Sequence, residues 1–148
     1  MKRFAFALEK VLELRKYYEQ EAKVELGRAI SVLTEIENNI KTNAHLRSQA
    51  ASERFSVIGA TENGGAISMF DWDNYILRLE QEAQRLAEEA IKAKAVVEEK
   101  RNIYLEASRE LKVMEKLKEK RQKEYREEVF AAETSERDDT WRAKALDA

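Results

Sequence analysis

The stretch that decides the fold is 72–114, which reads WDNYILRLEQEAQRLAEEAIKAKAVVEEKRNIYLEASRELKVM. Alternating steps of four and three from Trp72 meet an apolar side chain at twelve of thirteen positions, with Lys100 as the exception. A seven-residue repeat held this long is typical of a helix that supercoils with a partner helix. The thirteen seam positions are Trp72, Ile76, Leu79, Ala83, Leu86, Ala90, Ala93, Val97, Lys100, Tyr104, Ala107, Leu111 and Met114.

The composition of the whole chain agrees with a long helix and excludes several other classes. The 148 residues include no proline, no cysteine and four glycines, and 38% of them are charged. The absence of proline argues against a fold with many turns, and the absence of cysteine excludes a disulfide scaffold and thiolate chemistry. No apolar run approaches the ~18 residues that a membrane span needs, and the stretch 4–8 is too short for a signal peptide. We therefore predict an all-α, soluble, cytoplasmic protein.

The chain is expected to break once, around its glycines. Three of the four glycines fall in 59–65, so we predict helix one over 4–55, a loop over 56–70 and helix two over 71–132. The acidic tail 133–148 has no partner and is expected to fray. The stripe of helix one reads Ala5, Leu8, Leu12, Arg15, Glu19, Ala22, Leu26, Ala29, Leu33, Ile36 and Ile40, and Val11, Tyr18, Ile30 and Val32 are expected to widen it.

Two helices with one apolar stripe each, joined by a loop, bury both stripes by folding back on each other. We therefore predict a single domain over 1–148, a two-helix antiparallel coiled-coil hairpin that is a monomer on its own. In this pairing the numbers of facing residues add to about 126, so that Ile40 meets Leu86 and Leu12 meets Met114.

Nothing in the sequence points to catalysis. A two-helix rod encloses no pocket, and the single histidine, His45, has no nearby groups that would complete a site. The glycine pair at 64–65 lacks the lysine and hydroxyl residue of a phosphate-binding loop. We predict a protein that is not an enzyme and has no metal or cofactor.

Charge is distributed unevenly along the chain. Residues 1–16 hold five basic and two acidic side chains, and 112–126 hold seven and three, so a hairpin brings a net charge of about +7 to its terminal end. The segments 35–98 and 127–148 each have a net charge of −4. The interleaved glutamates argue against nucleic-acid binding by the basic end.

Three segments of this sequence resemble the FliJ family, the soluble component of the bacterial flagellar type III export apparatus. They are FAFALEKVLELR at 4–15, FDWDNYILRLE at 70–80 and YLEASRELKVMEKLKEKRQKEY at 104–125. The resemblance implies an antiparallel coiled coil similar to the stalk of rotary ATPases. It implies action with the hexameric export ATPase in ring assembly, contact with the membrane export gate, and handling of export chaperones. The protein is then expected at the cytoplasmic side of the inner membrane, without inserting into it.

The resemblance also suggests site residues. The family's gate contacts fall at positions that match Tyr75, Leu79, Glu82 and Leu86. From the charge distribution, the residues expected to face the ATPase are Arg15, Lys16, Lys116, Lys120, Arg121 and Lys123. Two alternatives are the equivalent stalk of a virulence-type secretion system and a structural homo-oligomeric coiled coil, in which the stripes pair between chains.

Overall fold

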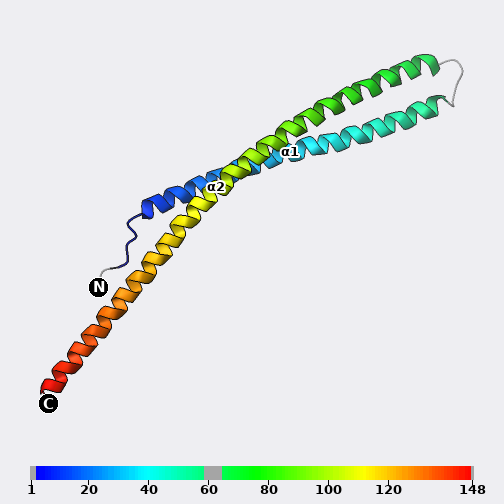
Figure 1. Cartoon of the computed structure of the whole chain (residues 1–148). Coiled ribbons are helices and arrows are strands. Elements are labelled where there is room, and N and C mark those ends of the chain that lie inside the picture. Colours follow the sequence, from blue (N-terminus) through cyan, green and yellow to red (C-terminus); the bar gives the residue numbers. More distant parts are fainter. Residues whose placement is uncertain (1–2, 59–64, 148) are drawn as a thin grey trace. The chain divides into compact units, whose positions relative to one another are not determined.

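The computed structural model describes residues 3–58 and 65–147, and this part of the chain contains helices and no strand. Helix α1 comprises Glu9–Ile58 and helix α2 comprises Gly65–Asp147, with 50 and 83 residues. Figure 1 shows both helices and the non-helical segment that precedes α1. The two helices pack against each other with opposite chain directions, which confirms the predicted all-α hairpin.

The predicted element boundaries need correction. Helix α1 begins at Glu9 rather than at residue 4, because residues 3–8 leave the helix path and run along α2. Helix α2 begins at Gly65 rather than at residue 71, and residues 59–64 of the predicted loop lie outside the described residues. The expected fraying from residue 133 is wrong, since α2 continues to Asp147. No glycine or proline follows Gly65, so nothing in the sequence ends this helix early.

The chain divides into two compact units, each of which contains part of both helices. One unit comprises Met1–Ala22 and Tyr104–Ala148, and is called the terminal unit below. The other comprises Lys23–Ile103 and is called the loop unit. The single domain over 1–148 stays a prediction.

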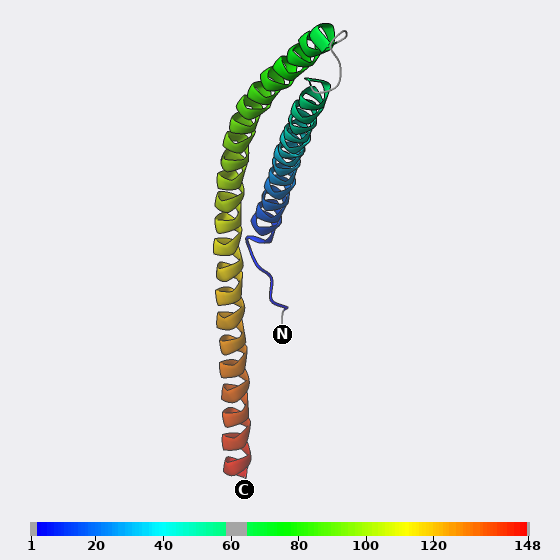
Figure 2. The same ribbon diagram turned by 90° about the vertical axis from the view of Figure 1, so that its right-hand side faces the viewer.

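In the loop unit, the end of α1 lies beside the start of α2 in both views (Figures 1 and 2). Its buried apolar side chains are small for the most part, as coiled-coil seams between close helices require. They are Ala29, Ala50, Leu86, Ala90, Ala93 and Val97. One polar side chain, Asn43, is buried among them at 5% exposure.

In the terminal unit, the first turns of α1 pack on the middle of α2. Leu12 is the most deeply buried side chain of the described residues, with 1% of its surface exposed. Two ion pairs join the helices on either side of it, Arg15 with Glu110 and Glu9 with Lys118. Their residue numbers add to 125 and 127, close to the predicted relation between facing residues.

The predicted seams are confirmed with two exceptions. The first is that Ala5 and Leu8, the first two predicted positions of helix one, are exposed, because they precede the start of α1 at Glu9. All thirteen seam positions of helix two are buried or half-buried, and so are the predicted positions of helix one from Leu12 to Ile40. The second exception concerns Val11, Tyr18, Ile30 and Val32, which were expected to widen the stripe and are exposed by 37–53%. A helix that packs on one partner buries only a narrow seam, so the apolar residues beside it stay in water.

Candidate functional site

The terminal unit carries a group of exposed lysines that we call the basic patch, composed of Lys16, Lys116, Lys120 and Lys123. Steps of four and three residues place the last three on one face of α2. None of the four forms an ion pair within the part of the chain that the structure describes. Their charges are therefore available to a partner, and they belong to the set that the sequence predicts to face an ATPase.

The two arginines of that set are engaged inside the unit. Arg15 lies in the seam, where its Nη1 donates to Oε2 of Glu110 at 2.7 Å. Arg121 faces Glu124 at 3.8 Å on the same helix. Each arginine therefore has a carboxylate close to its guanidinium, and the four lysines carry the free positive charge of the predicted surface.

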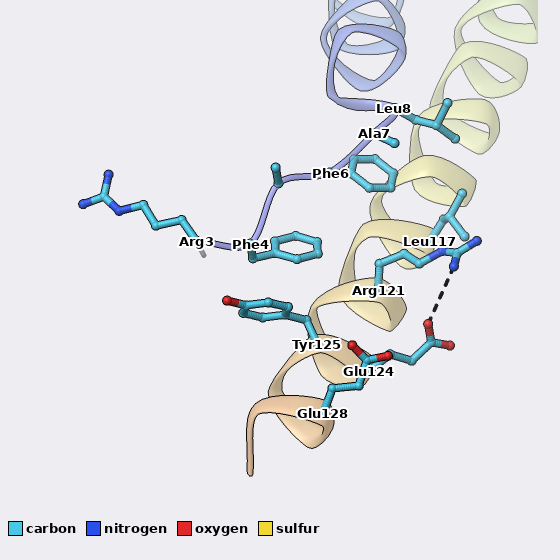
Figure 3. Close-up of a pocket in the computed structure, with 11 residues that line it drawn as sticks. Arg3, Phe4, Phe6, Ala7, Leu8, Leu117, Arg121, Glu124, Tyr125 and Glu128 are labelled. Atoms are coloured by element: carbon cyan, nitrogen blue, oxygen red, sulfur yellow. Dashed lines mark ion pairs between the residues drawn. The ribbon is translucent and has the colours of Figure 1, made fainter. Parts of the chain in front are cut away.

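The segment before α1 forms a second feature of the terminal unit, which we call the N-terminal arm (residues 3–8). Its Phe4 ring packs on Tyr125 of α2, with ring centroids 5.6 Å apart and a tilt of 47° between the rings. Figure 3 shows the two rings facing each other, with Arg3 pointing away. A hollow of about 570 Å³ lies between arm and helix, and Phe6, Leu8 and Leu117 contribute to its walls.

The predicted gate-facing residues lie at the start of α2 in the loop unit, and they differ in accessibility. Tyr75 is half-buried, and its ring packs edge-on against the ring of Trp72, with the ring centroids 6.0 Å apart. Both rings line a hollow of about 440 Å³ whose other walls include Leu46 and Ala50 of α1. Acidic and basic side chains stand at its rim, namely Glu53, Asp71 and Arg78.

Leu79 and Leu86 belong to the hairpin seam. Leu86 is 4% exposed, because its side chain packs between α2 and α1. Leu79 is half-buried, and its main-chain carbonyl accepts a hydrogen bond from the Asn43 side chain. Leu86 is therefore inaccessible to a partner, whereas Tyr75, Leu79 and Glu82 are half-buried and part of each side chain reaches the surface.

Glu82 takes part in a small charge network on the surface of α2. The Arg85 guanidinium donates a hydrogen bond to its carboxylate and holds the pKa of that carboxyl below its usual value. The same contact raises the pKa of Arg85, which also donates to Glu89. Glu82 therefore presents a partly compensated charge to any partner.

Two elements of these surfaces were absent from the sequence predictions. Asn43 continues the seam of helix one by one step beyond Ile40, so the heptad spacing itself places it at the interface. The contact between Phe4 and Tyr125 depends on an arm that leaves the helix, and no residue pattern around 4–8 signals that departure.

Two further features are absent from the part of the chain that the structure describes. This part contains no group of three or more histidine, cysteine, aspartate or glutamate side chains placed to hold a metal ion. Among the same residues, no helix is apolar over a length that would cross a membrane. His45, the single histidine, lies on an exposed part of α1.

The comparison with protein families gave one match, which covers almost the whole chain. Residues 4–144 match the family model described as Flagellar FliJ protein. The searches of curated proteins and of solved structures gave no match. The match includes the whole of α1, α2 as far as residue 144, and most of the N-terminal arm.

Proposed function

The chain belongs to the FliJ family, a component of the flagellar export apparatus, and from this premise we propose that it is a non-enzymatic stalk and adaptor of the export ATPase. In this role it promotes assembly of the ATPase ring and couples the ring to the export gate and to export chaperones. It then works in the cytoplasm, peripherally associated with the membrane-embedded export apparatus.

The observation that carries the proposal is the basic patch of the terminal unit. Lys116, Lys120 and Lys123 span about 10 Å along one face of α2 at ~1.5 Å per residue. Exposed and unpaired cations attract an acidic partner over distances of about one Debye length, ~8 Å at physiological salt. Such attraction orients the protein so that its terminal unit meets the ring first.

The gate contact is proposed for the loop unit. Tyr75 and Glu82 reach the surface of α2, and the hollow beside Tyr75 has two aromatic walls. A hollow of this composition accepts an apolar side chain, and its charged rim adds specificity. Leu79 and Leu86 support this surface by fixing α2 on α1.

Charge reversal of the basic patch tests the ATPase contact. The variant carries Lys116→Glu, Lys120→Glu and Lys123→Glu, and its control carries Lys41→Glu, Lys92→Glu and Lys94→Glu in the loop unit. All six lysines are exposed, so both variants change the net charge equally without touching the seam. We expect the first variant to bind and stimulate the purified export ATPase about tenfold less well, with weaker salt dependence, and the control to match the wild type.

Circular dichroism checks that both variants keep their helix content. If the patch variant stays helical and stimulates the ATPase as well as the control, the basic patch does not dock the ring and the proposal for this surface fails.

A further inference from the structure

The N-terminal arm covers a part of α2 that α1 does not reach. Glu9, the first residue of α1, is paired with Lys118, so α2 continues beyond α1 from there. Gln122, Glu124 and Tyr125 lie past this point and are nevertheless half-buried, and each lines a hollow together with residues of the arm. We call the covered face of α2 the arm site, and it consists of Leu117, Arg121, Gln122, Glu124, Tyr125 and Glu128.

The arm lies on this site as an extended segment. Phe4 and Phe6 are half-buried and point toward α2, whereas Arg3, Ala5 and Ala7 are exposed (Figure 3). Side chains alternate between two sides in this way in an extended chain and not in a helix. The arm site therefore holds a short extended segment in which two aromatic residues are separated by one small residue.

The charges of α2 explain why the arm does not continue α1 as a helix. Steps of four and three past Met114 lead to Lys118 and Arg121, so the seam of α2 becomes cationic at this point. An apolar arm in helical form finds no apolar partner there. The arm instead leaves the helix path and meets Leu117 and Tyr125, which flank the two cations along α2.

The contact between the arm and α2 is loose. Besides the hollow of about 570 Å³ between them, a second hollow of about 320 Å³ is lined by Phe4, Gln122, Tyr125 and Arg126. Protein cores leave few voids larger than a water molecule, so the arm is packed less tightly than a core segment. A terminal segment held in this way can leave its site while both helices stay folded.

We propose that the N-terminal arm is an autoinhibitory strap. It occupies the arm site within its own chain, and it must leave before an extended segment of another protein binds there. The segment that fits has the chemistry of the arm itself, namely two aromatic side chains separated by one small residue. This inference goes beyond the proposed function and does not rest on it, because neither the basic patch nor the hollow beside Tyr75 takes part.

The covalent link between the arm and α1 makes the strap effective although its contact is loose. A segment joined to its site by a short linker acts at an effective concentration in roughly the millimolar range. A free segment with equal contacts must reach a similar concentration to displace the arm, and a segment with more contacts displaces it at a lower one. The strap therefore sets a threshold for binding at the arm site.

The test measures how a peptide with the sequence of residues 3–10, RFAFALEK, binds to the full chain by fluorescence anisotropy. The open variant carries Phe4→Ala with Phe6→Ala, which removes both rings of the strap. Its control carries Phe55→Ala with Phe70→Ala, two exposed rings of the loop unit. We expect the peptide to bind the open variant at least about tenfold more tightly than the wild type or the control, because a strap closed in about nine molecules of ten lowers the apparent affinity by that factor.

A further variant and a second peptide locate the binding. Leu117→Ala with Tyr125→Ala, added to the open variant, removes apolar side chains of the arm site and is expected to abolish binding. A peptide of the same composition with its two phenylalanines adjacent is expected not to bind, since an extended chain then points the rings to opposite sides. Circular dichroism checks that every variant keeps its helix content.

Hydrogen exchange tests the strap on the wild type, without any substitution. The RFAFALEK peptide at a concentration on the order of millimolar is expected to release the arm and to speed exchange of the Glu9 amide, which donates to the Phe6 carbonyl. The peptide with adjacent phenylalanines is the control and is expected to leave this exchange unchanged.

Four outcomes overturn the inference. Equal affinity of the peptide for the wild type and the open variant means that the arm shields nothing. No binding to the open variant means that the arm site takes no segment besides the arm, and binding that survives the loss of Leu117 and Tyr125 lies elsewhere. If the wild type forms dimers in sedimentation velocity and the open variant does not, the arm is exchanged between two copies and is not a strap within one chain.

Discussion

The side-chain amide of Asn43 donates a hydrogen bond of 3.0 Å to the main-chain carbonyl of Leu79, and this bond ties α1 to the backbone of α2 inside a buried seam. The Asn43 carbonyl oxygen in turn accepts from Nε of Arg47 at 2.9 Å. A polar residue at one seam position fixes the register of a coiled coil, because any slip leaves it buried without a partner. Asn43 therefore fixes the register of α1 against α2 in the loop unit.

Asn43→Ala is expected to destabilise the protein by about 1–2 kcal/mol, since it removes an interhelical hydrogen bond and leaves a gap in the seam. Asn39→Ala is the control, because Asn39 is exposed on the same helix and gains the same helix propensity. Urea unfolding followed by circular dichroism measures both. Equal midpoints for the two variants would show that Asn43 does not hold the hairpin.

Two leucines of α2 differ in burial, and this difference predicts how much each contributes to stability. Leu86 is 4% exposed and Leu77 is 51% exposed. We expect Leu86→Ala to cost about 2–4 kcal/mol through lost burial and an unfilled cavity. Leu77→Ala is expected to cost well under 1 kcal/mol. Thermal and urea unfolding of the two variants check the difference, and similar losses at both sites would contradict the register.

Pairing within one chain can be tested with cysteines, because the natural chain has none. Arg54 Nε and Asp73 Oδ1 are 2.6 Å apart in the loop unit, so Arg54→Cys with Asp73→Cys places two thiols within reach of a short bismaleimide. We expect a crosslink inside the chain, since the connection between the helices raises the local concentration of the partner.

The single-cysteine variants serve as controls for this experiment, because they can be joined only between chains. Mass spectrometry of the denatured product distinguishes the two species. A double variant that yields dimers as its main product would favour the homo-oligomeric alternative over a monomeric hairpin.

The charge network around Glu82 predicts a dependence on pH. Because Arg85 lowers the pKa of Glu82 in the folded chain, the contact stabilises the fold above the ordinary pKa of glutamate and loses this effect as the pH falls through the lowered value. Arg85→Gln is expected to raise the pKa of Glu82 towards its ordinary value. Carboxyl-detected NMR titration measures it, and Arg101→Gln, far along the helix, should leave Glu82 unaffected.

The sequence predicts the fold well because heptad spacing and burial have the same physical origin. The steps from Trp72 to Met114 identify the side of α2 that packs on α1, and the structure buries or half-buries each of these residues. The same steps, continued past Ile40, place Asn43 at the interface. The net charge of a segment did not predict which of its cations are free. Arg15 and Arg121 belong to the basic segments and yet face Glu110 and Glu124.

Features that depend on tertiary contact were not predictable in this way. The sequence 4–8 is compatible with a helix, and its non-helical path comes with the packing of Phe4 on Tyr125 more than a hundred residues away. The prediction for the end of α2 was also wrong. Residues 133–148 were expected to fray because they have no partner helix. This stretch contains no glycine or proline that would end the helix, and eight of the fifteen residues 133–147 are good helix formers.

The N-terminal arm gives the last prediction. Phe4→Ala removes the ring that packs on Tyr125, so we expect residues 3–8 to detach from α2 and the terminal unit to lose about 0.5–1.5 kcal/mol. Hydrogen exchange should then rise at the first turn of α1, where the Glu9 amide donates to the Phe6 carbonyl at 3.1 Å. Phe55→Ala is the control, because Phe55 is 79% exposed in the other unit. If Phe4→Ala leaves exchange at Glu9 unchanged, the arm is held by its backbone and by Phe6 and Leu8, and the ring contact contributes nothing to its position.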